Sequence, residues 1–275
     1  MSSTTTRLIL VTDLDGCLLN KHDYDWSAAA STLEILRKAK IPVVMNSSKT
    51  VPEMTQLAIE LGLQGSTFIS ENGAVIRWGV DVAQWGTGEP VDESEIIGAS
   101  RKDILLVLQE LKQRFQFRSF ADLGVAGIME QTQLSEAKAS LAFDRQATEP
   151  LLWDDTDEHL SEFGSILSRH QLTLTKGGRF WHIAGHTTKG KAMQRVAQRM
   201  SVPESTTIVA AVGDSPIDQS MLDLADVPIG IPTANGLGVT VDRKRGIVAT
   251  RQGAVGWAEA VTKLLSRIEV PLTEN

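Results

Sequence analysis

Short apolar runs alternate with amphipathic stretches near both ends of the chain. Residues 8–11, 41–46 and 206–212 are segments dominated by apolar side chains, of the kind that form buried parallel strands. Apolar spacing of three and four residues predicts helices from Ser27 to Lys38, from Thr50 to Gly62, and over 189–200, 218–224 and 256–265. The segments 67–70 and 74–77, joined by a Glu-Asn-Gly turn, predict a hairpin. This alternation predicts an α/β class with a doubly wound, Rossmann-like parallel sheet.

The periodicity of apolar positions is lost over residues 78–100, which are rich in Gly, Asp and Glu. Beyond it, helices are predicted over 102–115, as a short pair over 123–145, and over 155–170, with short strands near 149–153 and 179–183. We therefore expect residues 1–80 and 186–275 to form the core, and residues 81–185 to form an inserted α+β cap domain. Two linkers would let such a cap close over the sheet edge and exclude water from a bound ligand.

Composition narrows the class of protein. The chain has 275 residues, 42% of them hydrophobic, without an apolar run long enough to span a bilayer or a cleavable signal pattern at its start, so we expect a cytoplasmic protein. Its one cysteine, Cys17, cannot form an internal disulfide, and we expect a small buried residue there rather than a nucleophile. The formal charge of −7, from 27 basic and 34 acidic residues, argues against a nucleic-acid or membrane partner.

Two carboxylates, Asp13 and Asp15, and then Gly16 follow the first apolar run. Open α/β sheets place their chemistry at the carboxyl ends of strands, and aspartate gains nothing there as a strand former. The chemistry that fits is a carboxylate nucleophile beside a general acid/base, with a hard cation between the nucleophile and a phosphate. The same residues also suit a plain surface turn.

Two lysine-bearing clusters follow. Ser47, Ser48 and Lys49 lie where the second strand ends and a helix begins, a natural phosphate cradle, although Ser48 or Thr50 could simply cap the helix. Lys49 favours the cradle, because a cation in a first helical turn opposes the helix dipole unless an anion is present. Lys189 heads another helix and could also be an ordinary surface lysine, as we expect of Lys191.

The fourth cluster, Asp214 to Asp218, follows the most apolar strand and repeats the arrangement of the first. Carboxylates gathered from two strand ends repel one another unless a cation offsets their charge. Oxygen ligands of this kind suit Mg²⁺, which also shares its coordination with phosphates. A Mg²⁺ site is therefore expected.

The ordered set of these four motifs resembles the haloacid dehalogenase-like phosphatases, and the large insertion resembles their Cof-type cap. NSSKT with the ENG turn, the stretch from Leu134 to Trp153, and GGRFWH over 177–182 are similar to the mannosyl-3-phosphoglycerate phosphatase family. The resemblance spans residues 8 to about 257 of the chain. One departure is Ile217, where related sequences usually have asparagine, and it removes a polar group from the surroundings of the metal.

The resemblance implies a role for each matching residue. Asp13 would be the nucleophile that becomes an aspartyl-phosphate, and Asp15 the acid that protonates the leaving oxygen and then activates water. Ser47 and Lys189 would hold the phosphoryl oxygens. Asp13, the backbone carbonyl of Asp15, and Asp214 would bind Mg²⁺, with Asp218 supporting them. The expected substrate-binding residues are Ser48, Lys49, Asn72, Gly73, Arg179 and His182.

The expected function is hydrolysis of mannosyl- or glucosyl-3-phosphoglycerate to a glycosylglycerate, a compatible solute. Arg179 and His182 would read the glycerate carboxylate and the sugar hydroxyls, although His182 could instead be satisfied within the cap sheet; Trp153 and Trp181 are expected to be cap core. Alternatives are a general sugar-phosphate phosphatase of the Cof type, a phospho-accepting signalling module, and, from Ile217, a pseudoenzyme. The sequence leaves the oligomeric state open.

Overall fold

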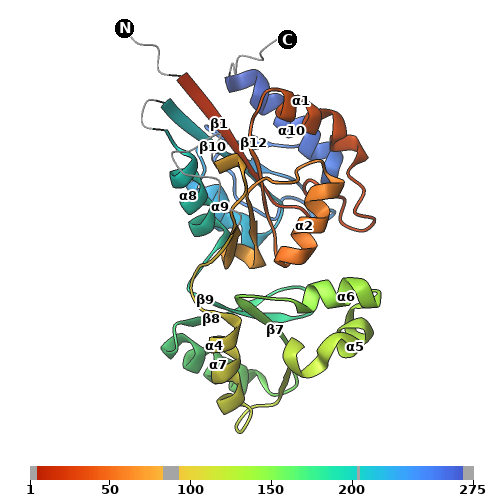
Figure 1. Cartoon of the computed structure of the whole chain (residues 1–275), viewed down its shortest axis with the longest axis vertical. Helices are drawn as coiled ribbons and strands as arrows, with labels where there is room; N and C mark the ends of the chain where they lie inside the picture. Colours follow the sequence, from red (N-terminus) through yellow and green to blue (C-terminus); the bar gives the residue numbers. More distant parts are fainter. Residues whose placement is uncertain (1–4, 83–92, 203–204, 269–275) are drawn as a thin grey trace.

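The structure, a computed structural model, describes residues 5–82, 93–202 and 205–268, and contains two sheets (Figure 1). The larger has the strand order β12-β11-β10-β1-β2-β3-β4-β5. Its strands are β1 (Thr5–Thr12), β2 (Val43–Asn46), β3 (Phe68–Ser70), β4 (Val75–Arg77), β5 (Ser94–Ile96), β10 (Ser205–Gly213), β11 (Val227–Gly230) and β12 (Ile247–Val248). Pairing is parallel from β12 to β3, and antiparallel from β3 through β4 to β5.

Successive side chains of β1 point to opposite faces of this sheet, so its apolar run makes both faces hydrophobic. Helices cover both of these faces. Leu8 and Leu10 pack with α1 (Ala30–Lys38), α2 (Val51–Glu60) and α10 (Gly253–Ile268). Ile9 and Val11 pack on the other face, with α8 (Lys189–Met200) and α9 (Gln219–Leu224). A strand buried on both faces needs an uninterrupted apolar run, which residues 8–11 provide. The predicted α/β fold with a mostly parallel sheet is confirmed.

Helix starts follow local capping chemistry. Thr50, one of the two candidate caps, forms a capping box at α2, where Thr50 Oγ1 accepts from the Glu53 N–H (3.3 Å) and Glu53 Oε2 accepts from the Thr50 N–H (2.8 Å). Ser27 does not cap a helix. It begins a 3₁₀ turn (η1, Ser27–Ala29), in which the Asp25 carboxylate accepts from the Ser27 N–H and hydroxyl. A carboxylate two residues earlier therefore holds this turn, and α1 begins at Ala30 rather than at the predicted Ser27.

The second sheet is antiparallel and belongs to the inserted segment, with the order β6-β7-β9-β8. Its strands are β6 (Phe117–Ser119), β7 (Thr148–Trp153), β8 (Leu172–Lys176) and β9 (Trp181–Gly185). The helices of this segment are α4 (Arg101–Leu111), α5 (Phe120–Thr132), α6 (Glu136–Phe143) and α7 (Asp157–Arg169). Side chains from α4, α7 and the sheet form one core, and α5 and α6 form a smaller one. The short strands β6 and β8 were not predicted.

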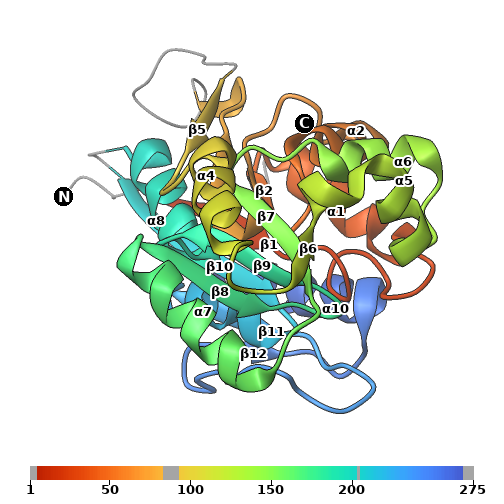
Figure 2. The same cartoon turned by 90° about the horizontal axis from the view of Figure 1, so that it is seen from below.

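The cap lies across the edge of the core sheet where its parallel strands end, opposite the chain termini (Figure 1). Seen from the cap side, β7, β8 and β9 overlie the ends of β1 and β10 (Figure 2). The strand β5 falls inside the range 81–185 but pairs with β4, so it extends the core sheet. The domain boundaries stay a prediction. Among the described residues, no helix has both the length and the apolar character that crossing a membrane requires.

Candidate active site

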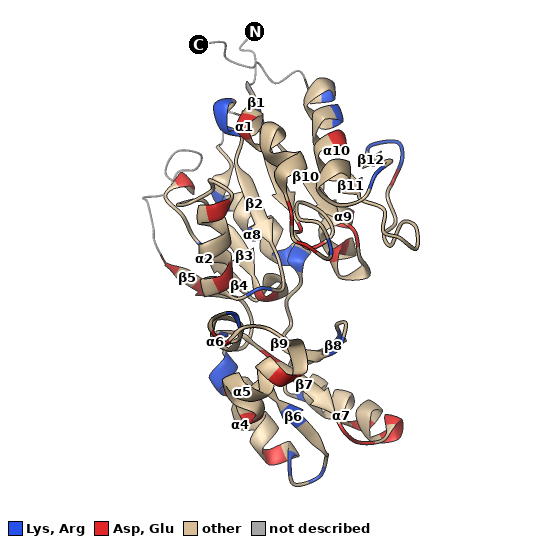
Figure 3. Cartoon of the chain, turned by 90° about the vertical axis from the view of Figure 1, so that its right-hand side faces the viewer, with Lys and Arg blue, Asp and Glu red and all other residues tan. Residues whose placement is uncertain are grey.

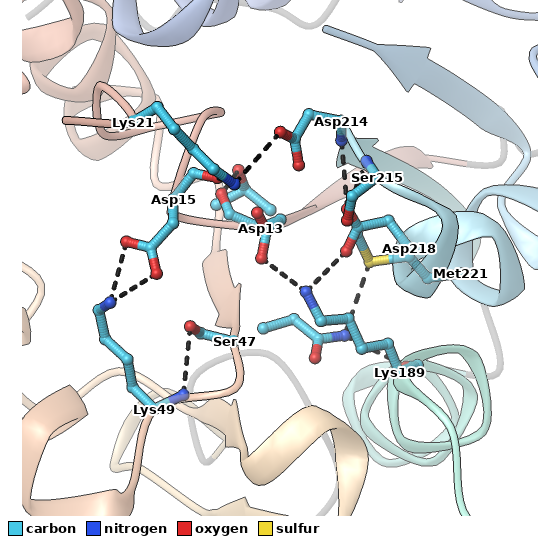
Figure 4. A network of polar contacts seen from close by, with 12 residues as sticks. Asp13, Asp15, Lys21, Ser47, Lys49, Lys189, Asp214, Ser215, Asp218 and Met221 are labelled. Carbon is cyan, nitrogen blue, oxygen red and sulfur yellow. Dashed lines mark hydrogen bonds and ion pairs between the residues drawn. The ribbon is translucent and has the colours of Figure 1, made fainter. Parts of the chain in front are cut away.

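Asp13 and Asp214 come together because they follow neighbouring parallel strands. Thr12 at the end of β1 is in register with Val212 in β10, and the Asp13 N–H donates to the Val212 carbonyl (2.9 Å). Carboxylate oxygens of Asp13 and Asp214 and the thiol of Cys17 lie within 4.8 Å of one another. All three residues are buried, and Figure 4 shows both aspartates facing the same space.

The strand end that carries Asp13 is fixed from behind. The Thr12 hydroxyl donates to the Asp13 carbonyl (2.7 Å), and itself accepts from the indole N–H of Trp257 in α10 (2.9 Å). Thr12 and Trp257 are both fully buried. This chain of hydrogen bonds limits how far the Asp13 backbone can shift, and no motif in the sequence signals it.

Lys189, at the start of α8, is buried and bridges two carboxylates. Its Nζ donates to Asp13 Oδ1 (2.5 Å) and to Asp218 Oδ1 (2.6 Å). Burial raises the pKa of Asp13 to about 7, although the charge of Lys189 opposes the rise. The two carboxylates in turn raise the pKa of Lys189 against the effect of its burial, so that it remains an ammonium. The structure thus excludes the surface lysine considered for this position.

Asp218 holds the loop that presents Asp214. Its Oδ2 accepts from the backbone N–H groups of Asp214 (3.2 Å) and Ser215 (3.1 Å) and from the Ser215 hydroxyl (2.8 Å). Its other oxygen receives Lys189, so one carboxylate fixes both the loop and the lysine. Gly213 permits this approach, since a Cβ there would lie 2.4 Å from the Cβ of Asp218.

Asp15 is engaged by Lys49. The Lys49 Nζ donates to both Asp15 oxygens, at 2.6 and 2.9 Å, and lies over the ring of Tyr24. The charge of Asp15 raises the pKa of Lys49 against the opposing effect of burial. Ser47 is buried beside this pair, and its Oγ accepts from the Lys49 N–H (3.4 Å). The structure therefore places Asp15, Ser47 and Lys49 around one space (Figure 4).

A hard divalent cation fits the oxygens at this edge. Burial raises the pKa of both Asp13 and Asp214, and the neighbouring Asp218 charge raises them further, a strain that a bound cation would relieve. A Cβ at Gly16, whose φ is +98°, would lie 2.5 Å from Asp214 Oδ2. Glycine therefore lets the Asp214 carboxylate approach the backbone that follows Asp15. Carboxylate and carbonyl oxygens are the donor set that Mg²⁺ prefers.

A cavity of about 400 Å³ separates these groups from the cap. The core contributes Asp13, Asp15 and Lys189 to its lining, and the cap contributes Lys176 and His182. A second chamber of about 240 Å³ adjoins it, since both are lined by Asn72, His182, Lys189, Pro216 and Ile217. Position 217, where the family asparagine is missing, therefore faces the substrate space.

Polar atoms in the smaller chamber lack partners. Burial, with the nearby charge of Arg145, lowers the pKa of His182 to about 4, so its ring is neutral near pH 7. Its Nδ1 and the Asn72 Oδ1 are buried without a hydrogen-bond partner among the described residues. The hydroxyl-bearing residues Thr148, Thr173 and Thr175 line the same chamber. A neutral imidazole suits a hydroxyl better than a carboxylate.

The other predicted substrate residues are not gathered equally. Ser48 lines the larger cavity, whereas Arg179 is exposed in the turn between β8 and β9 and is not part of either lining. Gly73 is buried, and a Cβ there would lie 2.4 Å from the Thr188 carbonyl oxygen. Its position is explained by close backbone packing against the start of α8. Lys176 is a cation in the cavity lining that sequence reasoning did not single out.

A buried ionic network joins the cap to the core beside the cavity. The Glu71 carboxylate accepts from the backbone N–H groups of Gln146 (2.7 Å) and Ala147 (3.2 Å) and from the Thr148 hydroxyl. Arg145 lies 3.6 Å from this carboxylate and donates to the carbonyl of Ser48 (2.9 Å). The cap loop between α6 and β7 is thus tied directly to the loop that carries Ser47. The sequence shows these residues but not their contact.

Comparisons with known proteins agree with this geometry. A family model described as haloacid dehalogenase-like hydrolase matches residues 10–236. Similar solved structures include a haloacid dehalogenase-like hydrolase from Bacteroides thetaiotaomicron (TM-score 0.64, 18% identity, covering 94% of this chain and 99% of that one). Another, a phosphatase of the haloalkanoate enzyme superfamily from the same organism, has TM-score 0.64 and 17% identity over 98% of this chain and 97% of that one. A haloacid dehalogenase-like hydrolase from B. subtilis has TM-score 0.57 and 18% identity over 94% and 99%. Sequence identities this low support a shared fold alone. The family match, by contrast, covers most of the chain, and the chain therefore belongs to the haloacid dehalogenase-like hydrolases.

Proposed function

We propose that the chain is a Mg²⁺-dependent phosphatase that hydrolyses mannosyl- or glucosyl-3-phosphoglycerate through an aspartyl-phosphate on Asp13. The observation that carries the phosphatase assignment is the convergence of Asp13, Asp15 and Asp214 with Lys189 at one sheet edge, facing a cavity closed by the cap. The relative from Bacteroides thetaiotaomicron that is described as a phosphatase supports the same reaction class.

The first step would be attack by a carboxylate oxygen of Asp13 on the phosphorus, with cleavage of the bond to the glycerate oxygen. Asp15, which must be in its protonated form for this step, would donate a proton to that leaving oxygen, which departs as an alcohol. Lys189, already bound to Asp13 Oδ1, would orient the nucleophile and neutralise charge on the phosphoryl oxygens, as Ser47 would from its buried position.

In the second step, Asp15 would take a proton from water, whose oxygen attacks the phosphorus of the aspartyl-phosphate. The bond between phosphorus and the Asp13 oxygen breaks, and inorganic phosphate leaves. Asp13, the carbonyl of Asp15, and Asp214 would hold Mg²⁺, with Asp218 keeping the Asp214 loop in place. When bound, the ion supplies neutralisation of the phosphoryl charge.

The glycoside substrate is favoured by the cap side of the cavity. The chamber with His182, Asn72 and Thr175 offers neutral polar partners, which suit sugar hydroxyls. Lys176 in the cavity lining and Arg179 in the adjoining turn offer cations for a glycerate carboxylate. The product of this hydrolysis would be a glycosylglycerate, which belongs to the class of compatible solutes.

A substrate panel tests the proposal. Purified protein with Mg²⁺ should release phosphate faster from mannosyl- or glucosyl-3-phosphoglycerate than from simple hexose phosphates or an aryl phosphate. Equal rates on all of them would favour a general sugar-phosphate phosphatase of the Cof type. Asp15→Asn should accumulate a phospho-enzyme slowly, because the attack by Asp13 survives while the acid and base are lost. A long-lived aspartyl-phosphate in the wild type, without turnover, would point to a signalling module instead.

A further inference from the structure

Lys21 lies at the outer side of the proposed metal site. Its Nζ donates to the backbone carbonyl of Asp15 (3.3 Å) and lies 3.8 Å from Asp214 Oδ2. Figure 4 shows the ammonium between these two groups, above Asp13. The two oxygens it contacts belong to two of the three groups assigned to Mg²⁺ above.

The three lysines of this edge are held very differently. Lys189 is buried and makes two short contacts, and Lys49 grips both oxygens of Asp15. The Lys21 side chain is 59% exposed, and its two contacts are at the long end of the range for hydrogen bonds and ion pairs. An exposed, flexible ammonium with long contacts is held weakly, so it can be displaced with little cost.

Displacement of Lys21 also has space available. Its side chain lines the substrate cavity and a larger neighbouring cavity of about 660 Å³ on the core surface. The ammonium can therefore leave the Asp15 carbonyl and Asp214 by rotation of its own side chain, without a change in the backbone.

A divalent cation and an ammonium cannot use these oxygens together, because like charges within a few ångströms repel. We propose that Lys21 is a built-in competitor of the catalytic cation, whose ammonium shares the Asp15 carbonyl and Asp214 with the metal site and must leave them for the cation to bind. Lys21 thereby lowers the affinity for Mg²⁺ and partly neutralises Asp214 when no cation is bound. This inference rests on the proposed function, since it assumes the Mg²⁺ site.

Isothermal titration of the full-length protein with MgCl₂ tests this role. Lys21→Met removes the ammonium but keeps the aliphatic stem, and should bind Mg²⁺ about two- to fivefold more tightly, the range that loss of an exposed ion pair supports. Lys21→Arg keeps the charge and should stay closer to the wild type. Lys191→Met is the matched control, because Lys191 is an exposed lysine whose Nζ contacts the His186 carbonyl, away from these carboxylates.

The outcomes separate two kinds of failure. If the wild type binds Mg²⁺ and Lys21→Met binds it equally or more weakly, Lys21 is not a competitor, and the proposed phosphatase is untouched. If neither the wild type nor Lys21→Met binds Mg²⁺, the metal site itself is wrong, and both the proposed function and this inference fail. A tighter Lys21→Met, with an unchanged melting temperature and an unchanged Lys191→Met, supports the competition.

Discussion

Replacing Asp13 by asparagine should stabilise the fold at neutral and higher pH while removing the proposed nucleophile. In the folded protein, burial raises the pKa of Asp13 to about 7, so the fold disfavours the charged carboxylate. An asparagine carries no charge at any pH, and its side-chain oxygen can still accept from the Lys189 ammonium at the position of Oδ1. The variant keeps the shape of the site but loses the cost of a buried negative charge.

The sign and size of the effect follow from linkage. Because the folded pKa lies above the unfolded value of about 3.9, Asp13 contributes its full stability below about pH 4 and loses it as pH rises to about 7. A shift of roughly 3 pKa units corresponds to about 4 kcal/mol at most, using about 1.4 kcal/mol per unit. Relaxation of the site reduces this figure, and we expect a difference of about 2–4 kcal/mol between the variant and the wild type above about pH 7.

Denaturant unfolding in the presence of a chelator, from about pH 5 to about pH 8, measures this difference. The free energy of unfolding of the wild type should fall relative to Asp13→Asn across that range. Asp144→Asn, at an exposed position, is the control and should follow the wild type. If the free energies of unfolding of the wild type and Asp13→Asn changed in parallel with pH, the ionised Asp13 carboxylate would not destabilise the fold, and this reasoning would be refuted.

Three further predictions address the metal, the buried contact between cap and core, and the substrate. Chelation should silence the enzyme and Mg²⁺ restore it, while Ca²⁺ should inhibit because its longer, looser coordination misplaces nucleophile and phosphate; full activity in chelator would exclude the site. Glu71→Gln should lower the free energy of unfolding by about 3–5 kcal/mol, since it leaves the buried Arg145 without its counter-charge, and Glu71→Gln with Arg145→Met should recover part of the loss in the same unfolding assay. If Arg179 binds the glycerate carboxylate, Arg179→Ala should lower kcat/KM for the glycosyl-3-phosphoglycerate by a factor on the order of ten to a thousand but change aryl phosphate hydrolysis little; equal effects on both substrates would remove Arg179 from the site.

Local rules were sufficient for the parts of the fold that local interactions decide. The apolar run of β1 and the capping box of α2 were legible because strand burial and helix capping depend on neighbouring residues. The strands β6 and β12, of three and two residues, were missed, since so short a segment carries no periodicity. The strand β8 has five residues, and its alternation of Leu and Thr is the pattern of a half-buried strand, so it could have been predicted from the sequence and was overlooked.

The site also contains residues that the sequence predicted and contacts that only the structure shows. Asp13, Asp15 and Asp214 were predicted to meet because they follow strands that pair in parallel and end at one edge of the sheet. Lys189, at the start of a helix, was assigned to the site only through the resemblance to the haloacid dehalogenase-like phosphatases. The contacts of the Glu71 side chain with the side chains of Arg145 and Thr148 join positions more than 70 residues apart, and no local pattern encodes them. Lys21 was not predicted as a site residue, because the side chain of an exposed lysine after a turn can adopt many orientations. Only the structure shows that its ammonium lies beside the Asp15 carbonyl and Asp214.

The charges of this edge explain why the metal should matter for binding as well as for chemistry. Four carboxylates, those of Asp13, Asp15, Asp214 and Asp218, face three ammonium groups, and every ammonium contacts at least one of the carboxylates. Figure 3 shows acidic and basic positions interleaved along the core edge that faces the cap. With all seven groups ionised the cluster is negative by one charge and repels a phosphate dianion. A divalent cation makes it positive by one charge, and an ammonium that yields its carboxylate to the cation becomes free to meet the phosphate oxygens. An acidic protein can in this way bind an anionic substrate with its few lysines.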